Sequence, residues 1–491
     1  MSLQSRTIAG VLWSFIEQLL RRGISIIVTL LLARFLVPED FGLLAMMTVF
    51  IAIATALMDS GIQQAVIRKL EPDDAYFCTA FYTNLALGAL AYTLLFSAAP
   101  FIASFYEEPR LVLLIRVAGV VVLINAFQVI QVAMLSRDLN FKMQMKASVP
   151  AAIISGIVAV VMAYMGFGVW ALIAQTVLSA LLIVLIYWWV QPWRPKLVFD
   201  LRALKEMYSF GYKLFLSGIL DTVSRNIYVL VIAKVFSAGI AGLYFFAERI
   251  KDLVISQLVQ SVQKVTYPAL STLQDDDAKL KEGYRNVMQV TTFMLFPAML
   301  MLAALAQPLF ELFFPERWLP AVPYLQLMCI VGVLYPVHSI NLNILKVKGR
   351  SDLFLGLEVF KKITLFAVLF ISYRYGVIGI LIGKGVQSII AYIPNSYFSK
   401  RLIGYSVREQ LSDVLPGLGM AAAVSLVVYY LQLFSIFSPL VSLVVYGAAG
   451  LATYLLLAKA FKLTAFQLAE SMIRKRLPSR APQCQDDCRA L

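Results

Sequence analysis

The sequence has few charged residues compared with a soluble protein of its size. Only 14 % of its 491 residues are charged and 60 % are hydrophobic, which gives a mean hydropathy of +0.81. No polar stretch is long enough to fold as a separate soluble domain, whereas apolar runs of roughly 20 residues recur along the chain. We therefore expect a polytopic membrane protein whose function lies in its membrane helices.

Metal-ligating and disulfide-forming residues are also scarce. The chain has one histidine, His338, and four cysteines. Cys78 and Cys329 fall within apolar runs, whereas Cys484 and Cys488 flank the tail motif CQDDC, which we interpret as a pair of reduced cytosolic thiols. We expect His338 to be a helix-packing residue, and the sequence predicts no metal site and no cofactor.

The apolar runs have the length of helices and lack the alternation of membrane barrel strands, so we predict an all-α integral membrane protein. We expect about fourteen transmembrane helices, near residues 8–36, 41–66, 77–104, 111–135, 147–166, 168–190, 209–236, 240–268, 288–314, 321–345, 353–372, 377–398, 414–434 and 438–460. These form an N-terminal six-helix lobe over 1–190, a cytoplasmic linker over 191–208, a C-terminal six-helix lobe over 209–400, an additional helix pair over 401–465 and a basic cytoplasmic tail over 466–491.

Lysine and arginine gather in alternate loops between these spans, which predicts that both termini are cytoplasmic. The first apolar run is long and interrupted by charge, so we interpret it as a span and not as a cleavable signal. Because most of the formal charge of +14 then faces an anionic leaflet, it predicts no nucleic-acid partner.

The two lobes show signs of an internal duplication at an offset of 200 residues. Ala33 matches Ala233, Arg34 matches Lys234, and Gly42 matches Gly242. An even number of spans in each half gives both repeats the same orientation, which is typical of a transporter with alternating access to a cavity between two lobes.

Charged residues interrupt several predicted spans, although a charge near the bilayer centre costs at least about 2.5–3.5 kcal/mol. In the first span Glu17 and Arg21 are four residues apart, on one helix face, and Arg22 follows. In the seventh span Asp221 and Arg225 repeat this spacing. Over all spans eight bases, Arg21, Arg22, Arg225, Arg249, Lys251, Lys361, Lys362 and Lys384, accompany six acids, Glu17, Asp59, Asp221, Glu248, Asp252 and Glu358.

This balance predicts a wet, mildly cationic cavity that binds an anionic ligand, since guanidinium groups match phosphate oxygens. Our candidates for substrate binding are Arg21, Arg22, Arg225, Arg249, Lys251, Lys361 and Lys384. Our candidates for cavity acids or ion coupling are Glu17, Asp59, Asp221 and Glu248, where Glu248, Arg249 and Asp252 could equally form a packing salt-bridge cluster. Amide and tyrosine side chains compatible with sugar hydroxyls are Asn84, Asn125, Gln128, Gln131, Tyr212 and Tyr228.

Three stretches carry a resemblance to a known family: LLARFLVPEDFGLLAMMTVFIAIATALMDSGIQQAVIRK, GLYFFAERIKDL and TYPALSTL. They resemble the polysaccharide-export and O-antigen-type flippases of bacterial envelopes, in the superfamily of multidrug extruders and the lipid II flippase. The resemblance implies two six-helix lobes, an extra helix pair and a cavity whose cations hold pyrophosphate or acidic sugars. By position, Arg21, Arg22 and Arg225 are the residues that could take this part.

The resemblance implies that a polyprenyl-pyrophosphate-linked oligosaccharide moves from the cytoplasmic to the periplasmic leaflet of the bacterial inner membrane, for exopolysaccharide, O-antigen or capsule assembly. A proton or sodium gradient could drive this movement, and a polysaccharide polymerase and export machinery are possible partners. One alternative is a multidrug or small-molecule extruder of the same fold. A glycan polymerase is less favoured because the extracytoplasmic turns are too short for a catalytic domain, so we expect a protein that is not an enzyme.

Overall fold

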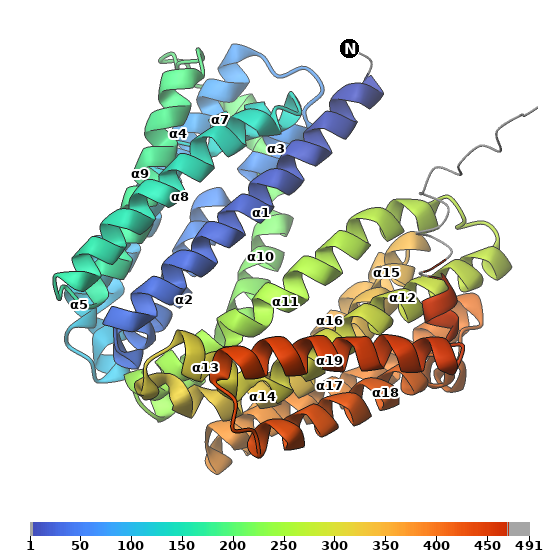
Figure 1. Ribbon diagram of the computed structural model, residues 1–491. Helices are drawn as coiled ribbons and strands as arrows, with labels where there is room; N and C mark the ends of the chain where they lie inside the picture. The colour runs from blue at the N-terminus through green and yellow to red at the C-terminus, as the bar shows by residue number, and fades with distance from the viewer. Residues whose placement is uncertain (1–2, 469, 471–491) are drawn as a thin grey trace, which may run out of the picture. The chain divides into compact units, whose positions relative to one another are not determined.

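The computed structural model describes residues 3–468 and 470; the side chains of residues 3–9, 11, 210, 213, 214, 256–265, 267–269 and 351 are not part of that description. In these ranges every regular element is a helix and there is no strand, which confirms the predicted all-α fold (Figure 1). Most of the predicted basic tail, including Cys484 and Cys488, lies outside the described residues.

The chain forms two compact units. The first comprises the residues up to Ile250, Phe310–Leu325 and Leu369–Ile380. Its helices are α1 (Leu3–Phe35), α2 (Pro38–Asp59), α3 (Ile62–Arg68), α4 (Asp74–Tyr106), α5 (Leu111–Ala118), α6 (Val120–Ala126), α7 (Val129–Arg137), α8 (Phe141–Tyr164), α9 (Val169–Val190), α10 (Leu201–Val235) and the first part of α11 (Ala238–Ser271), with the short 3₁₀ helices η1 (Glu316–Ala321) and η2 (Tyr373–Tyr375). Within this unit α8 packs lengthwise between α1 and α9 (Figure 1).

The second unit comprises Lys251–Leu309, Gln326–Val368 and the residues from Leu381 onward. It contains the rest of α11, α12 (Asp277–Ala304) and α15 (Tyr335–Val347), the larger parts of α16 (Ser351–Ser372) and α17 (Gly376–Ile403), and α18 (Val407–Leu433) and α19 (Pro439–Ala460). Helices α13 (Ala306–Phe313) and α14 (Val322–Gly332) each cross a boundary between the units in sequence. Here α12 packs against α18, and α18 packs against α19.

Ten segments are long and apolar enough to cross a membrane, or eleven when the bent pair Leu111–Ala126 and Val129–Arg137 counts as one span. These counts cover only the part of the chain that the structure describes. Neither α1 nor α11 is among them, and several charged residues interrupt both helices. One segment, Asp352–Ile403, is 52 residues long and is divided by η2 into two helices. The predicted number of fourteen spans therefore stays a prediction.

Some apolar runs that the sequence predicts as single helices are broken. The run over 41–66 is divided after Asp59, where Ser60 and Gly61 adopt left-handed conformations with φ of 41° and 76°. The run over 111–135 bends by 41° at residues 127 and 128. In contrast, α10 begins at Leu201, capped by the Asp200 carboxylate, so part of the predicted linker is helical. These breaks matter because polar side chains project from them.

The start of α2 passes very close to the start of α11, and both segments belong to the first unit. A Cβ atom at Gly42 would overlap the carbonyl group of Ala238, and a Cβ atom at Gly242 would overlap the carbonyl group of Pro38. The two contacts are reciprocal, since Pro38 and Gly42 lie 200 residues before Ala238 and Gly242. The matched glycines of the predicted duplication therefore meet at a helix crossing that a larger side chain would separate.

We expect Gly42→Ala and Gly242→Ala each to destabilise the folded protein by about 1–3 kcal/mol, because the added methyl group forces the two helices apart. Gly218→Ala is the matched control, since nothing lies within 4 Å of a Cβ at that position. Thermal unfolding in detergent, followed by loss of the monodisperse peak, measures the difference. Equal stability of Gly42→Ala and Gly218→Ala would contradict the crossing.

Candidate functional site

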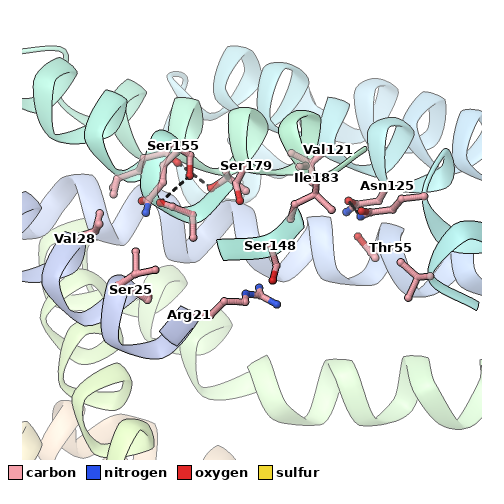
Figure 2. Close-up of a pocket in the computed structure, with 18 of the residues that line it drawn as sticks. Arg21, Ser25, Val28, Thr55, Val121, Asn125, Ser148, Ser155, Ser179 and Ile183 are labelled. Carbon is pink, nitrogen blue, oxygen red and sulfur yellow. Dashed lines mark hydrogen bonds between the residues drawn. The ribbon is translucent and has the colours of Figure 1, made fainter. Parts of the chain in front are cut away.

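The first unit contains a polar cavity of about 700 Å³ that is open on one side. Figure 2 shows residues that line it. Its walls come from α1, α2, α3, α6, α7, α8 and α9, with Arg249 of α11. Cavities of this size hold small molecules in many proteins. Its polar lining residues are Glu17, Arg21, Ser25, Thr29, Thr55, Asp59, Gln63, Asn125, Gln128, Gln144, Ser148, Ser155, Gln175, Thr176, Ser179, Tyr187 and Arg249.

Helix α1 presents the charged pair that the sequence predicts. Arg21 Nη1 lies 3.6 Å from Glu17 Oε1, and the same carboxylate oxygen accepts a hydrogen bond of 2.8 Å from Ser148 Oγ on α8. Figure 2 shows the side chains of Arg21 and Ser148 pointing toward one another. The Glu17 side chain is 12 % exposed whereas that of Arg21 is 54 % exposed. Glu17 is therefore held by the cavity wall, and the guanidinium group of Arg21 extends into the open space.

Polar stripes on α8 and α9 complete the wall. Gln144, Ser148 and Ser155 are spaced by about one and two helical turns, so they share one face of α8. Gln175 and Ser179 are spaced in the same way on α9. Because α8 packs against both α1 and α9, these polar stripes line the same cavity as the charged pair of α1.

The bend between α6 and α7 supplies two amides. Gln128 directly precedes α7, and its Nε2 donates a 2.6 Å hydrogen bond to Asn125 Oδ1 at the end of α6. This bond joins the two helices across the bend. It also fixes both amides at the cavity wall, where each has further donor and acceptor capacity. Figure 2 shows Asn125 at this wall.

Two more charges line the cavity. Arg249 Nη2 donates a 3.1 Å hydrogen bond to Ser25 Oγ of α1. Asp59 ends α2 at the break, and its Oδ1 atom is buried with no hydrogen-bond partner among the described residues. The cavity therefore carries two arginines and two carboxylates, and most of its polar groups are uncharged amides and hydroxyls.

Four of the predicted site residues, Glu17, Arg21, Asp59 and Arg249, are thus brought together in one cavity. Arg225 does not line it: its Nε lies 2.8 Å from Asp221 Oδ2 on the exposed side of α10. Arg22 is partly buried on α1 outside the lining, and Glu248 accepts a 3.4 Å hydrogen bond from the Tyr244 hydroxyl.

The remaining predicted cations, Lys251, Lys361 and Lys384, belong to the second unit. Lys251 is nearly buried, with Nζ 3.0 Å from Asp252 Oδ1, and Lys361 Nζ lies 3.3 Å from Glu358 Oε1. Lys384 is half-buried on α17. Among the described residues no group of three or more histidines, cysteines and carboxylates could hold a metal ion.

Of the predicted amides, Asn125 and Gln128 line the cavity, whereas Asn84 and Gln131 are buried elsewhere in the unit. Sequence reasoning missed Ser148, which binds Glu17, and the stripes with Gln144, Gln175 and Ser179. The periodic spacing of polar residues on α8 and α9 is a signal that could have found them. It is ambiguous on its own, because small and polar residues also pack membrane helices together.

Comparisons with known proteins agree with this architecture. The lipopolysaccharide biosynthesis protein WzxC of Escherichia coli K12 is 28 % identical over 417 residues, covering 84 % of each chain. The teichuronic acid biosynthesis protein TuaB of Bacillus subtilis 168 is 25 % identical over 436 residues, covering 86 % of this chain and 90 % of TuaB. The succinoglycan biosynthesis transport protein ExoT of Rhizobium meliloti 1021 is 25 % identical over 328 residues, covering 67 % of this chain and 66 % of ExoT.

The fold is also similar to that of a solved structure, the lipid II flippase MurJ in an inward closed conformation. The TM-score is 0.72 at 15 % identity, covering 92 % of this chain and 98 % of MurJ. The family described as "Polysaccharide biosynthesis protein" matches residues 31–323, more than half of the chain. This protein therefore belongs to the polysaccharide biosynthesis protein family.

Proposed function

We propose that this protein is a flippase that moves a polyprenyl-pyrophosphate-linked oligosaccharide from the cytoplasmic to the periplasmic leaflet of the bacterial inner membrane. The family match, the named biosynthetic roles of the relatives and the fold shared with a lipid II flippase support this assignment. In this proposal the protein is a transporter and not an enzyme, and both termini are cytoplasmic. The oligosaccharide would serve exopolysaccharide, O-antigen or capsule assembly.

The observation that carries the proposal is the polar cavity inside a unit of apolar helices. A polyprenyl chain needs no polar site because it is soluble in the bilayer, whereas each sugar hydroxyl that leaves water needs a hydrogen-bond partner. The amides of Asn125 and Gln128 and the hydroxyls of Ser148 and Ser179 offer both donors and acceptors. Such a lining suits the glycan part of the substrate.

Arg21 and Arg249 add the charge-assisted contacts for phosphate or acidic sugars. The position of Arg21, 54 % exposed and only loosely paired with Glu17, supports a direct role in binding. Arg22, Arg225, Lys251, Lys361 and Lys384 remain proposed contacts for later steps of transport. Glu17, Asp59, Asp221 and Glu248 remain proposed acids for coupling to an ion gradient.

The function is tested by a sidedness assay in proteoliposomes that contain a polyprenyl-pyrophosphate oligosaccharide. We expect wild type to expose the glycan on the far leaflet and Arg21→Ala/Arg225→Ala to slow this by about ten- to a hundredfold, since a hydrogen bond to a charged group contributes about 1.5–3 kcal/mol. Arg21→Lys/Arg225→Lys is the control that retains charge. If folded wild type moves no lipid-linked glycan and extrudes a soluble cation, the protein is an extruder of the same fold.

The cavity amides give a second prediction. We expect Asn125→Leu/Gln128→Leu to lower the transport rate by about tenfold or more, because two hydrogen bonds of about 1 kcal/mol each to sugar hydroxyls are lost. The matched control is Asn226→Leu, whose amide donates a 2.8 Å bond to the carbonyl of Thr222 in its own helix and does not line the cavity. Initial rates at limiting lipid-linked substrate compare the variants. Equal transport rates in Asn125→Leu/Gln128→Leu and in Asn226→Leu would exclude the two cavity amides from glycan binding.

A further inference from the structure

The second unit contains the only histidine of the chain in a polar cluster that the cavity described above does not explain. His338 lies in α15, two residues after Pro336, and its ring is bonded on both sides by α17. His338 Nε2 is 2.8 Å from Ser388 Oγ, and Nδ1 is 3.0 Å from Asn395 Nδ2. Asn395 directly follows Pro394, where a proline interrupts the hydrogen bonding of α17. The ring therefore joins two helices beside a proline in each.

The orientation of the Asn395 amide selects the protonation state of the ring. The Asn395 amide nitrogen can only donate, so Nδ1 accepts, and Nε2 carries the single proton and donates to Ser388 Oγ. The other amide atom, Asn395 Oδ1, is buried and has no hydrogen-bond partner within the described ranges. If the amide turned over, Oδ1 would face Nδ1 and would accept from a protonated ring. The same neighbours thus fit both the neutral and the charged histidine.

Other ionisable groups face the ring from neighbouring helices. They are Lys361 of α16, which interacts electrostatically with the ring and is paired with Glu358, and Tyr392 of α17, whose ring centroid is 6.4 Å from that of His338. Glu358 is the one carboxylate in this set of described groups. A proton on His338 therefore adds a second positive charge near the Lys361 and Glu358 pair, and the two like charges repel each other.

A buried hydrogen-bond network connects the histidine to the rest of the unit. Ser399 Oγ is 3.3 Å from the Asn395 carbonyl oxygen and 3.0 Å from Asn341 Oδ1, and Asn341 Nδ2 donates to Gln410 of α18 at 3.0 Å. The network continues when the Gln410 amide donates to the Tyr405 carbonyl and the Tyr405 hydroxyl donates to Asp413, which is paired with Arg285 of α12. Side-chain hydrogen bonds thus connect the main chain at Asn395 to α18, and Tyr405 and Asp413 connect α18 to α12.

We propose that His338 is a reversible proton-binding site in which the Asn395 amide turns over with the charge of the ring, and that this site couples a proton gradient to movement of α15 and α17. The site is neutral in the conformation described here and takes up a proton in another. Proton binding stands on the geometry alone, whereas the coupling role rests on the proposed transport function.

Because the chain has one histidine, protein labelled with ¹⁵N only at histidine reports on this site without assignment. We expect full-length protein in lipid nanodiscs to show the Nε2–H tautomer at pH 8, favoured by about tenfold since a hydrogen bond enforces it. The imidazolium should form only on acidification to about pH 4, because burial and nearby Lys361 both disfavour the charged ring. A ring that is still fully neutral at pH 4, or that is mainly Nδ1–H at pH 8, would overturn the proposal.

Two variants sharpen the test. Asn395→Leu removes the donor to Nδ1, so the tautomer preference should fall to within about threefold. Asn395→Asp, which is nearly isosteric, offers only acceptors to Nδ1, so it should reverse the tautomer to Nδ1–H at pH 8 and favour the imidazolium at a higher pH than in wild type. Asn343→Leu, which changes an amide of α15 that does not bond the ring, should leave the wild-type spectrum unchanged. A wild-type spectrum in both Asn395 variants would refute the role of the amide.

The coupling role of His338 is tested in a separate transport experiment. In proteoliposomes with a proton gradient, His338→Gln should lose the acceleration by the gradient and retain the rate without it. If the wild-type histidine titrates but no lipid-linked glycan moves, the proton site stands and the proposed function fails. If glycan moves and the gradient accelerates wild type and His338→Gln equally, the flippase stands and the coupling role of His338 is wrong.

Discussion

The structure depends on one constraint: a polar group on a membrane helix must find its partner inside the protein, because lipid offers none. Glu17 meets this constraint through Ser148 and Arg21, and the three groups join α1 to α8. The second unit meets it through amides and hydroxyls, where Asn341, Ser399 and Gln410 join α15, α17 and α18. These polar contacts therefore contribute to which helices are neighbours, in addition to apolar packing such as that of Phe41 against Phe246.

The close crossing of α2 and α11 shows how a second constraint, the space between backbones, adds to the first. Glycines at positions 42 and 242 allow the two helix backbones to approach closely. A Cβ atom at either position would overlap a main-chain carbonyl group of the other helix. Because the contact is reciprocal at the offset of 200, one sequence feature serves both sides of the crossing. A larger residue at either position would separate the helices, so the contact requires glycine in both repeats of the predicted duplication. This is a physical reason for the match between Gly42 and Gly242.

Much of the fold could be predicted from the sequence, and less of the site. Apolar runs gave the membrane class and most helices, and the spacing of Glu17 and Arg21 gave their pairing on one face. The breaks after Asp59 and at residues 127–128 were missed although each has a local signal, Asp-Ser-Gly at 59–61 and the amides Asn125 and Gln128, because a few polar residues within a long apolar run are also compatible with an unbroken helix. The polar faces of α8 and α9 were missed because Ser148 and Gln175 do not differ from packing residues until three helices are placed side by side.

The equal number of arginines and carboxylates in the cavity has a consequence for transport. A flippase must bind its substrate firmly enough to select it and weakly enough to release it. Arg21 is held 3.6 Å from Glu17, longer than the 2.7–2.9 Å of a strong charge-assisted bond, so a phosphate or acidic sugar can take the place of Glu17. In the proposed function Glu17 would take up the arginine again on release, because Ser148 keeps the carboxylate in position. The acid beside Arg21 would thus lower the net affinity for substrate and favour release, which an arginine without such a partner would not do.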